Sequence, residues 1–139
     1  MSLTKILDLA AGALNAQTVR LNTVASNLAN SDTVAGAPDK AYKAKRPVFQ
    51  TLLTAQQDGQ PASYGVTVKQ ITELQRANPQ VFDPDNPNAD AQGYVYRSNV
   101  NPLEEMTDML EAARSYESAL STASTARELM MRTLDLNTK

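Results

Sequence analysis

Apolar residues near the N-terminus recur at alternating intervals of four and three positions. This spacing runs from residue 3 to residue 28 and predicts a long amphipathic helix, because such positions share one helix face. Gln17 is the only polar residue on that face. Gly12 is the only glycine in the segment and permits close approach by another helix. The face consists of Leu3, Leu7, Ala10, Leu14, Gln17, Leu21, Val24 and Leu28.

A second long helix is predicted near the C-terminus, and its start is marked by three residues. Asn101 suits the N-cap, Pro102 suits the first helical position, and Glu104 stands three residues after the cap, as in a capping box. One apolar stripe comprises Leu103, Met106, Leu110, Ala113, Leu120, Met131 and Leu134. It is widened by Met109, Ala112, Tyr116, Ala119, Ala123, Ala126 and Met130. A stripe this wide can serve two neighbours.

The segment between the helices cannot be mostly helical, because residues 31–100 hold six of the seven prolines and four of the five glycines. Residues 65–73 are predicted to form a strand, with a change of phase before Ile71 that indicates a β-bulge. Weaker strands are predicted at 44–53 and 93–97, and Pro47 would then lie at an edge or a strand start. Residues 78–92 are predicted to form a polar loop.

The predicted fold is mostly α, with long N- and C-terminal helices pairing as a coiled coil around a small β-rich or irregular middle. Three parts follow: an N-terminal assembly helix at 1–30, a Pro/Gly-rich middle at 31–100, and a C-terminal assembly helix at 101–139. The middle is too small to cover both apolar faces, so other subunits are expected to do so. The candidate assembly residues are Leu3, Leu7, Leu14, Leu21, Val24, Leu28, Leu103, Met106, Leu110, Tyr116, Leu120, Met130, Met131 and Leu134.

Composition removes several classes of function. The 139-residue chain has a net charge of −2, divided as +1 over residues 1–30, 0 over 31–100 and −3 over 101–139. No basic stripe is therefore available for nucleic acid. Cysteine and histidine are absent, which excludes thiolate and imidazole catalysis and nearly all zinc sites. The N-terminus lacks the apolar region of a cleavable signal peptide.

Three polar clusters contain residue types that could carry chemistry, and each favours a structural interpretation. The acidic loop at 83–90 fails the EF-hand spacing, because Pro87 stands where a ligand belongs. The basic run at 43–46 is best explained as a solvated face or an intersubunit salt-bridge patch. Glu104 and Asp108 lie one turn apart, but acids at a helix N-terminus already have an electrostatic reason to be there. We therefore expect no catalytic, cofactor-binding or metal-binding residues and no small-molecule substrate.

The end of the first helix is more specific. The phrase Leu21-Asn-Thr-Val-Ala25-Ser-Asn27-Leu-Ala-Asn30 resembles the L-N-x-x-A-x-N-L-A-N signature of the bacterial flagellar rod and hook proteins. Its signature residues are Leu21, Asn22, Ala25, Asn27, Leu28, Ala29 and Asn30. Later stretches, including 42–50, 81–95, 99–101 and 130–134, extend the resemblance over nearly the full chain. Gly12, Gln17 and the insert at 35–39 lie outside the shared pattern.

This resemblance implies a non-enzymatic structural subunit of the flagellar basal-body rod, most similar to its proximal members. It implies polymerisation with itself and other rod subunits into a helical tube, contact with the membrane-embedded ring, and torque transmission to the distal rod and hook. It also implies unfolded export by the flagellar type III apparatus to the periplasm. The alternative from another class is a helical adaptor that binds a partner helix without polymerising.

Overall fold

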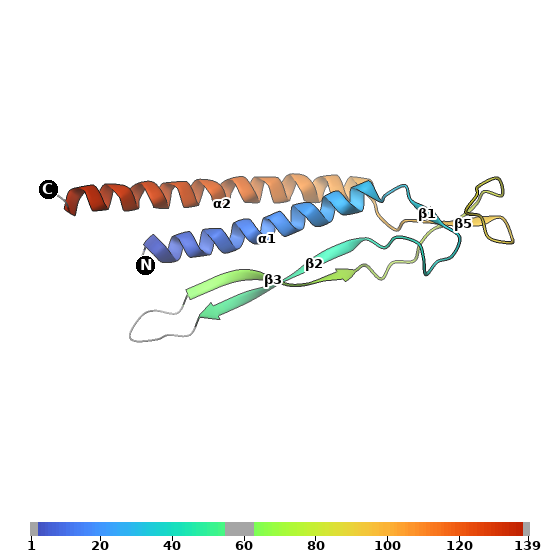
Figure 1. Cartoon of the computed structure of the whole chain (residues 1–139), viewed down its shortest axis with the longest axis horizontal. Helices are drawn as coiled ribbons and strands as arrows, with labels where there is room; N and C mark the ends of the chain where they lie inside the picture. The colour runs from blue at the N-terminus through green and yellow to red at the C-terminus, as the bar shows by residue number, and fades with distance from the viewer. Residues whose placement is uncertain (1–2, 55–62, 138–139) are drawn as a thin grey trace.

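A computed structural model describes residues 3–54 and 63–137 of the chain. Two long helices dominate it: α1 (Leu3–Ala29) and α2 (Pro102–Asn137). They run antiparallel and side by side, and the C-terminal end of α2 extends past the start of α1 (Figure 1). The predicted pairing of the two terminal helices is therefore confirmed, and both helices begin within one residue of the predicted positions.

The helices pack through small residues. The buried positions of α1 include Ala10, Ala16 and Val24, and those of α2 include Ala112 and Ala126. Small side chains let two helix backbones approach closely, and each buries little apolar area, so the core is thin. The stripe of α2 that faces α1 is thus the one built from alanines, whereas much of its leucine and methionine stripe is exposed.

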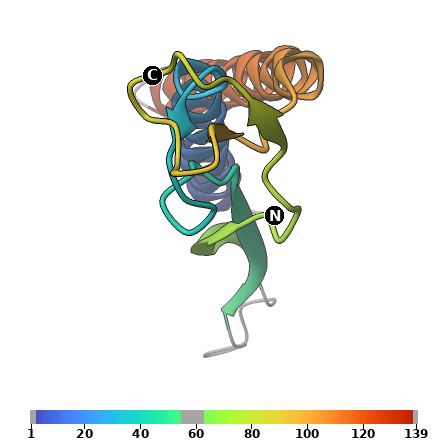
Figure 2. The ribbon, with the colours of Figure 1, turned by 90° about the vertical axis from the view of Figure 1, so that its right-hand side faces the viewer.

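The largest strands form a hairpin alongside α1. Strand β2 (Lys45–Thr54) pairs antiparallel with β3 (Ser63–Glu73), and both strands contact α1. Figures 1 and 2 show the hairpin and α2 on different sides of α1. A Cβ added to Gly12 would lie 3.2 Å from the carbonyl oxygen of Val66. The missing side chain at Gly12 therefore lets strand β3 approach α1 closely. The expectation that Gly12 serves a helix is wrong for this reason.

The register of the hairpin confirms the predicted bulge. Val48 pairs with Gln70 and Phe49 pairs with Val68, which leaves Lys69 without a partner on β2. Within the described residues, the strand that carries Pro47 pairs only with β3, so its missing N–H need not interrupt a second ladder. The position expected for a proline at a sheet edge is therefore observed.

A second, smaller sheet lies at the far end of the molecule from the start of α1 and the end of α2 (Figure 1). Its strand order is β1 (Val34–Ala35), β5 (Tyr94–Arg97), β4 (Gln80–Phe82), with antiparallel pairing throughout. The strand predicted at 93–97 is β5. The polar loop predicted at 78–92 is partly wrong, because three of its residues form β4. Backbone pairing with β5 and an edge-to-face contact between Phe82 and Tyr94, with centroids 5.2 Å apart, hold β4 in place.

Within the described residues, neither helix carries an apolar stretch that meets the length and hydropathy needed to cross a membrane.

Candidate assembly site

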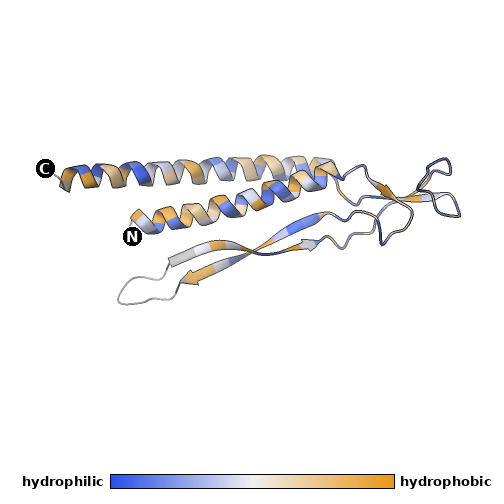
Figure 3. Cartoon of the chain, viewed as in Figure 1, coloured by the Kyte–Doolittle hydropathy of each residue, from blue (hydrophilic) through white to orange (hydrophobic). Residues whose placement is uncertain are grey.

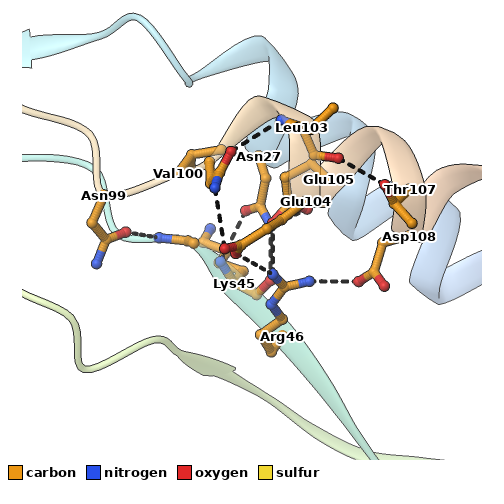
Figure 4. A network of polar contacts seen from close by, with 12 residues as sticks. Asn27, Lys45, Arg46, Asn99, Val100, Leu103, Glu104, Glu105, Thr107 and Asp108 are labelled. Carbon is orange, nitrogen blue, oxygen red and sulfur yellow. Dashed lines mark hydrogen bonds and ion pairs between the residues drawn. The ribbon is translucent and has the colours of Figure 1, made fainter.

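Asn27, in the signature phrase, joins three parts of the chain. Its side chain is completely buried. Its amide nitrogen donates to the carbonyl oxygen of Lys45 at 2.9 Å and to Glu105 Oε2 at 3.0 Å. Its amide oxygen accepts from the Lys45 N–H at 2.8 Å and from the Tyr42 hydroxyl at 3.1 Å. All four hydrogen-bonding positions of the amide are used, and the end of α1 is thereby tied to β2 and α2 (Figure 4).

A network of charges continues from this amide. Glu105 is 1% exposed, and its second oxygen lies 3.0 Å from Arg46 Nη2. Arg46 also pairs with Asp108 at 2.5 Å, and Asp108 in turn pairs with Arg20 of α1 at 2.9 Å. Figure 4 shows Arg46 at the base of the hairpin, pointing at this acidic face of α2. A buried carboxylate needs an ion pair and hydrogen bonds to offset its desolvation. Glu105 has the ion pair to Arg46 and one hydrogen bond, from Asn27 to Oε2, while the buried Oε1 has no hydrogen-bond partner within the described residues.

These contacts change the interpretation of two sequence clusters. Arg46 was expected on a solvated face or in a patch between subunits, whereas it binds carboxylates within its own chain. Glu104 and Asp108 do share a side of α2, and the helix dipole is not their whole explanation. Asp108 binds two arginines, and Glu104 lies 3.7 Å from Arg76. The arrangement is a structural junction between elements.

The signature phrase has a buried and an exposed side. Asn22, Ala25 and Ala29 are exposed, while Leu21 and Leu28 are half-buried. Asn30 is half-buried and donates to the carbonyl oxygen of Ser26 at 2.8 Å, which satisfies a carbonyl in the last turn of α1. The phrase therefore ends a helix and ties it to the hairpin through Asn27. It leaves small residues on the outer surface.

The start of α2 has the expected cap. The backbone N–H of Leu103 donates to Asn101 Oδ1 at 3.1 Å, and the N–H of Glu105 donates to the Asn101 carbonyl at 3.1 Å. Glu104 differs from a capping box, because its carboxylate accepts from the Asn101 side-chain amide at 3.1 Å. Pro102 is the first helical residue.

Two residues of this junction were given no role from the sequence, although Asn99 lies in the stretch 99–101 that extends the resemblance. Asn99 is 4% exposed; its oxygen accepts from the Ala44 N–H at 2.6 Å, and its nitrogen donates to the Leu74 and Arg76 carbonyls at 3.2 and 2.7 Å. Glu105 was the other omission. A signal for Glu105 existed, because it begins a 4,3 spacing with Met109, Ala112 and Tyr116, the face that α1 covers. No comparable periodic signal marked Asn99, whose partners are all distant in sequence.

The candidate assembly residues divide by exposure. Val24 is buried. The half-buried ones are Leu3, Leu7, Leu14, Leu21, Leu28, Tyr116 and Met130. The exposed ones all lie on α2 and are Leu103, Met106, Leu110, Leu120, Met131 and Leu134, with exposed fractions from 51% to 73%. The apolar residues along the helices and on the hairpin appear in orange in Figure 3. Part of the predicted surface thus serves the helix pair, and the α2 part has no cover within the described chain.

The acidic loop at 83–90 uses its side chains in turns. Asp83 accepts a hydrogen bond from the Asn86 amide, and Asp90 accepts from the backbone N–H groups of Gln92 and Tyr94. Such side-chain to backbone bonds are typical of Asx turns. Among the described residues, no three Asp, Glu, His or Cys side chains cluster closely enough to hold a metal ion.

An elongated helix pair held at one end by a polar junction, with a row of exposed leucine and methionine side chains, defines a structural subunit built for assembly. Comparisons with known proteins agree. Residues 7–37 match the family described as "Flagella basal body rod protein", and residues 91–136 match "Flagellar basal body rod FlgEFG protein C-terminal".

Relatives that match over nearly the whole of both chains show the family to which this chain belongs. The chain is 45% identical over 136 residues to a Yersinia enterocolitica protein and 42% identical over 138 residues to one from Salmonella typhimurium, covering 98% of both chains in each case. It is 36% identical over 142 residues to a Bacillus subtilis protein, covering 94% of this chain and 95% of the other. Each relative is named "Flagellar basal-body rod protein FlgC". The chain belongs to the flagellar basal-body rod protein family, a family of structural subunits rather than enzymes.

Proposed function

We propose that this chain polymerises with itself and with other rod subunits into the proximal part of the rod, a helical tube. The tube transmits torque from the membrane-embedded ring to the distal rod and hook. The observation that supports this most directly is the exposed apolar row on α2. A row of six exposed leucine and methionine side chains is typical of a surface that is covered in an assembly.

The shape of the subunit supports the same function. Two antiparallel helices present long side surfaces, so each subunit can contact several neighbours along its length (Figure 1). A contact between different surfaces of neighbouring subunits does not close on itself and builds a helical assembly. In such a tube, torsional load is shared among many contacts, each of which is individually weak.

The export route and location belong to the same proposal. The rod protein family and the resemblance of the helix signature support passage through the flagellar type III apparatus, without a cleaved signal peptide, to a periplasmic position next to the ring. The thin core and the small buried residues are compatible with a chain that is transported unfolded and orders on assembly.

The test is to delete the natural copy and restore it with an epitope-tagged one. We expect loss of rods and motility on deletion, recovery on restoration, and antibody label on the rod of isolated basal bodies next to the ring. Label found only in soluble complexes, with rods still formed in the deletion strain, would instead support the non-polymerising adaptor.

A further inference from the structure

The face of α2 that packs against α1 has a strict heptad spacing. Its positions alternate at intervals of four and three residues, and all of them are buried or half-buried. We call them the inner seam: Glu105, Met109, Ala112, Tyr116, Ala119, Ala123, Ala126 and Met130. Every seventh position after Glu105 is an alanine, so a buried carboxylate begins a seam of small side chains.

A second row lies exactly one residue further along α2. We call it the outer row: Met106, Leu110, Ala113, Glu117, Leu120, Ser124, Arg127 and Met131. Its residues Met106, Leu110 and Leu120 are 54%, 63% and 51% exposed. Successive residues of an α-helix differ in direction by about 100°, because 3.6 residues make one turn. A roll of α2 through that angle would exchange the two rows, and a helix start displaced by one residue produces such a roll.

Apolar content does not by itself select the inner seam. Over the first half of α2, the outer row offers Met106, Leu110 and Leu120, whereas the inner seam offers Met109 and Tyr116 among alanines. Over the second half, the serine and arginine of the outer row favour the opposite choice. Because alanine buries little apolar area, packing of the inner seam gains little over packing of the outer row.

The polar contacts of the junction, in contrast, require the inner seam to face α1. Glu105 accepts from Asn27 at 3.0 Å and lies 3.0 Å from Arg46, and Asp108 lies 2.5 Å from Arg46 and 2.9 Å from Arg20 (Figure 4). A roll of about 100° would carry both carboxylates away from these partners and leave buried donors without an acceptor. Specifying one arrangement among several is the best-attested use of buried polar groups.

We propose that Glu105 and Asp108 select which face of α2 is buried. Through their partners on α1 and β2, they hold the inner seam against α1 and so keep Met106, Leu110 and Leu120 on the outside. Both are positioning residues. The selection acts within a single free chain, so it goes beyond the proposed function and is testable without assembly.

The chain contains no cysteine, so single cysteines can report which face is covered. Ala112→Cys lies on the inner seam, where Ala112 is 0% exposed, and Ala113→Cys lies beside it on the outer row. The measurement is the rate of maleimide labelling of the purified folded chain. When Glu105→Ala and Asp108→Ala are added together, we expect the rate at position 112 to rise at least tenfold. The rate at position 113 should fall by half or more.

Two controls separate a roll of α2 from other effects. Ala16→Cys, at a position of α1 that is 2% exposed, should stay protected, because a roll of α2 does not unfold the chain. Glu111→Ala removes an exposed carboxylate that also pairs with Arg20, at 3.1 Å. Exposed ion pairs contribute little, so this variant should leave all three labelling rates unchanged.

A reversal tests the competition between the two rows directly. Met106→Ser and Leu110→Ser are added to the chain that already carries Glu105→Ala and Asp108→Ala. These changes remove large apolar side chains from the outer row, so the inner seam should again be preferred. We expect the labelling rate at position 112 to return to within threefold of its original value.

Unchanged rates at positions 112 and 113 in the Glu105→Ala, Asp108→Ala chain would overturn the inference, because packing alone would then select the face. A rise at both positions would overturn it too, since the carboxylates would stabilise the helix pair without choosing a face. An equal effect of Glu111→Ala would contradict a specific role for the two carboxylates. All of these outcomes concern the free chain and leave the proposed function untouched.

Discussion

At the scale of single residues, Asn27 links three parts of the chain through the four hydrogen bonds of one side chain. Its amide replaces a stretch of backbone pairing: it donates to and accepts from the same residue, Lys45, as a neighbouring strand would. Its second donor hydrogen bond goes to the buried carboxylate of Glu105. Few other side chains could meet these demands, because the site requires two donors and two acceptors in one plane.

We therefore expect Asn27→Ala to destabilise the folded chain severely. Each buried polar group left without a partner costs about 1–3 kcal/mol, and several are affected here. Asn27→Asp should also destabilise, since it replaces a donor to Glu105 with a second carboxylate. Urea unfolding followed by circular dichroism measures both. Asn22→Ala, at an exposed position of the same phrase, is the control and should change stability by no more than about 0.5 kcal/mol.

Asn101 supports a smaller prediction. Its side chain caps α2 through the Leu103 N–H, so Asn101→Ala should cost about 1 kcal/mol, whereas Asn101→Asp and Asn101→Ser should cost little. In a polymer the loss recurs in every subunit, and slower assembly is expected. The thermal transition of the purified chain and the rate of rod recovery in cells are the measurements. An Asn101→Ala chain that melts and assembles like the original would show that packing against α1 alone fixes this helix start.

At the scale of elements, the sequence predicted the helices and strands that carry a periodic pattern of apolar residues or a clear cap. The 4,3 spacing located α1, the capping residues and the apolar stripe located α2, and alternation in 65–73 located β3 and its bulge. Strand β4 was not predicted, because three residues are too few to show a period and their conformation depends on pairing with β5. The junction escaped for a similar reason. Arg46 and Glu105 are 59 positions apart, and only the folded chain brings them to 3.0 Å.

The helix pair is held by more contacts at one end than at the other, and this difference predicts a gradient of amide exchange along α2. Near Asn27 and Glu105, both helices are tied by buried hydrogen bonds and ion pairs. The last turns of α2 extend past α1, and Leu129, Leu134 and Leu136 are exposed there. In dilute monomer we expect slow exchange at 20–28 and 103–112 and rapid exchange at 129–137, measured by hydrogen exchange and mass spectrometry. Uniform protection along α2 would contradict this gradient.

At the scale of the whole molecule, one face of α2 is buried in the fold and another is left exposed, and the assembly that we propose would use the exposed face. The face of α2 that includes Ala112 and Ala126 is buried within the chain, while Leu103 and Leu110 stand outside it at 73% and 63% exposure. A substitution on the outer face should therefore affect assembly without unfolding the monomer. A substitution at Leu21, on α1, would separate the two effects less cleanly, because this side chain is half-buried within the chain.

Leu110→Asp is the sharpest form of this test. If neighbouring subunits bury this leucine, losing it costs about 2–5 kcal/mol at each contact, and the new charge adds a desolvation cost. We expect rods and motility to be lost while the circular dichroism spectrum and unfolding midpoint of the purified chain stay near those of the original. Ser118→Asp places the same charge on another exposed position of α2 and should assemble normally. Normal rods with Leu110→Asp would mean that neighbours do not cover this face. Equal loss with Ser118→Asp would mean that added negative charge on α2, rather than the lost apolar contact, blocks assembly.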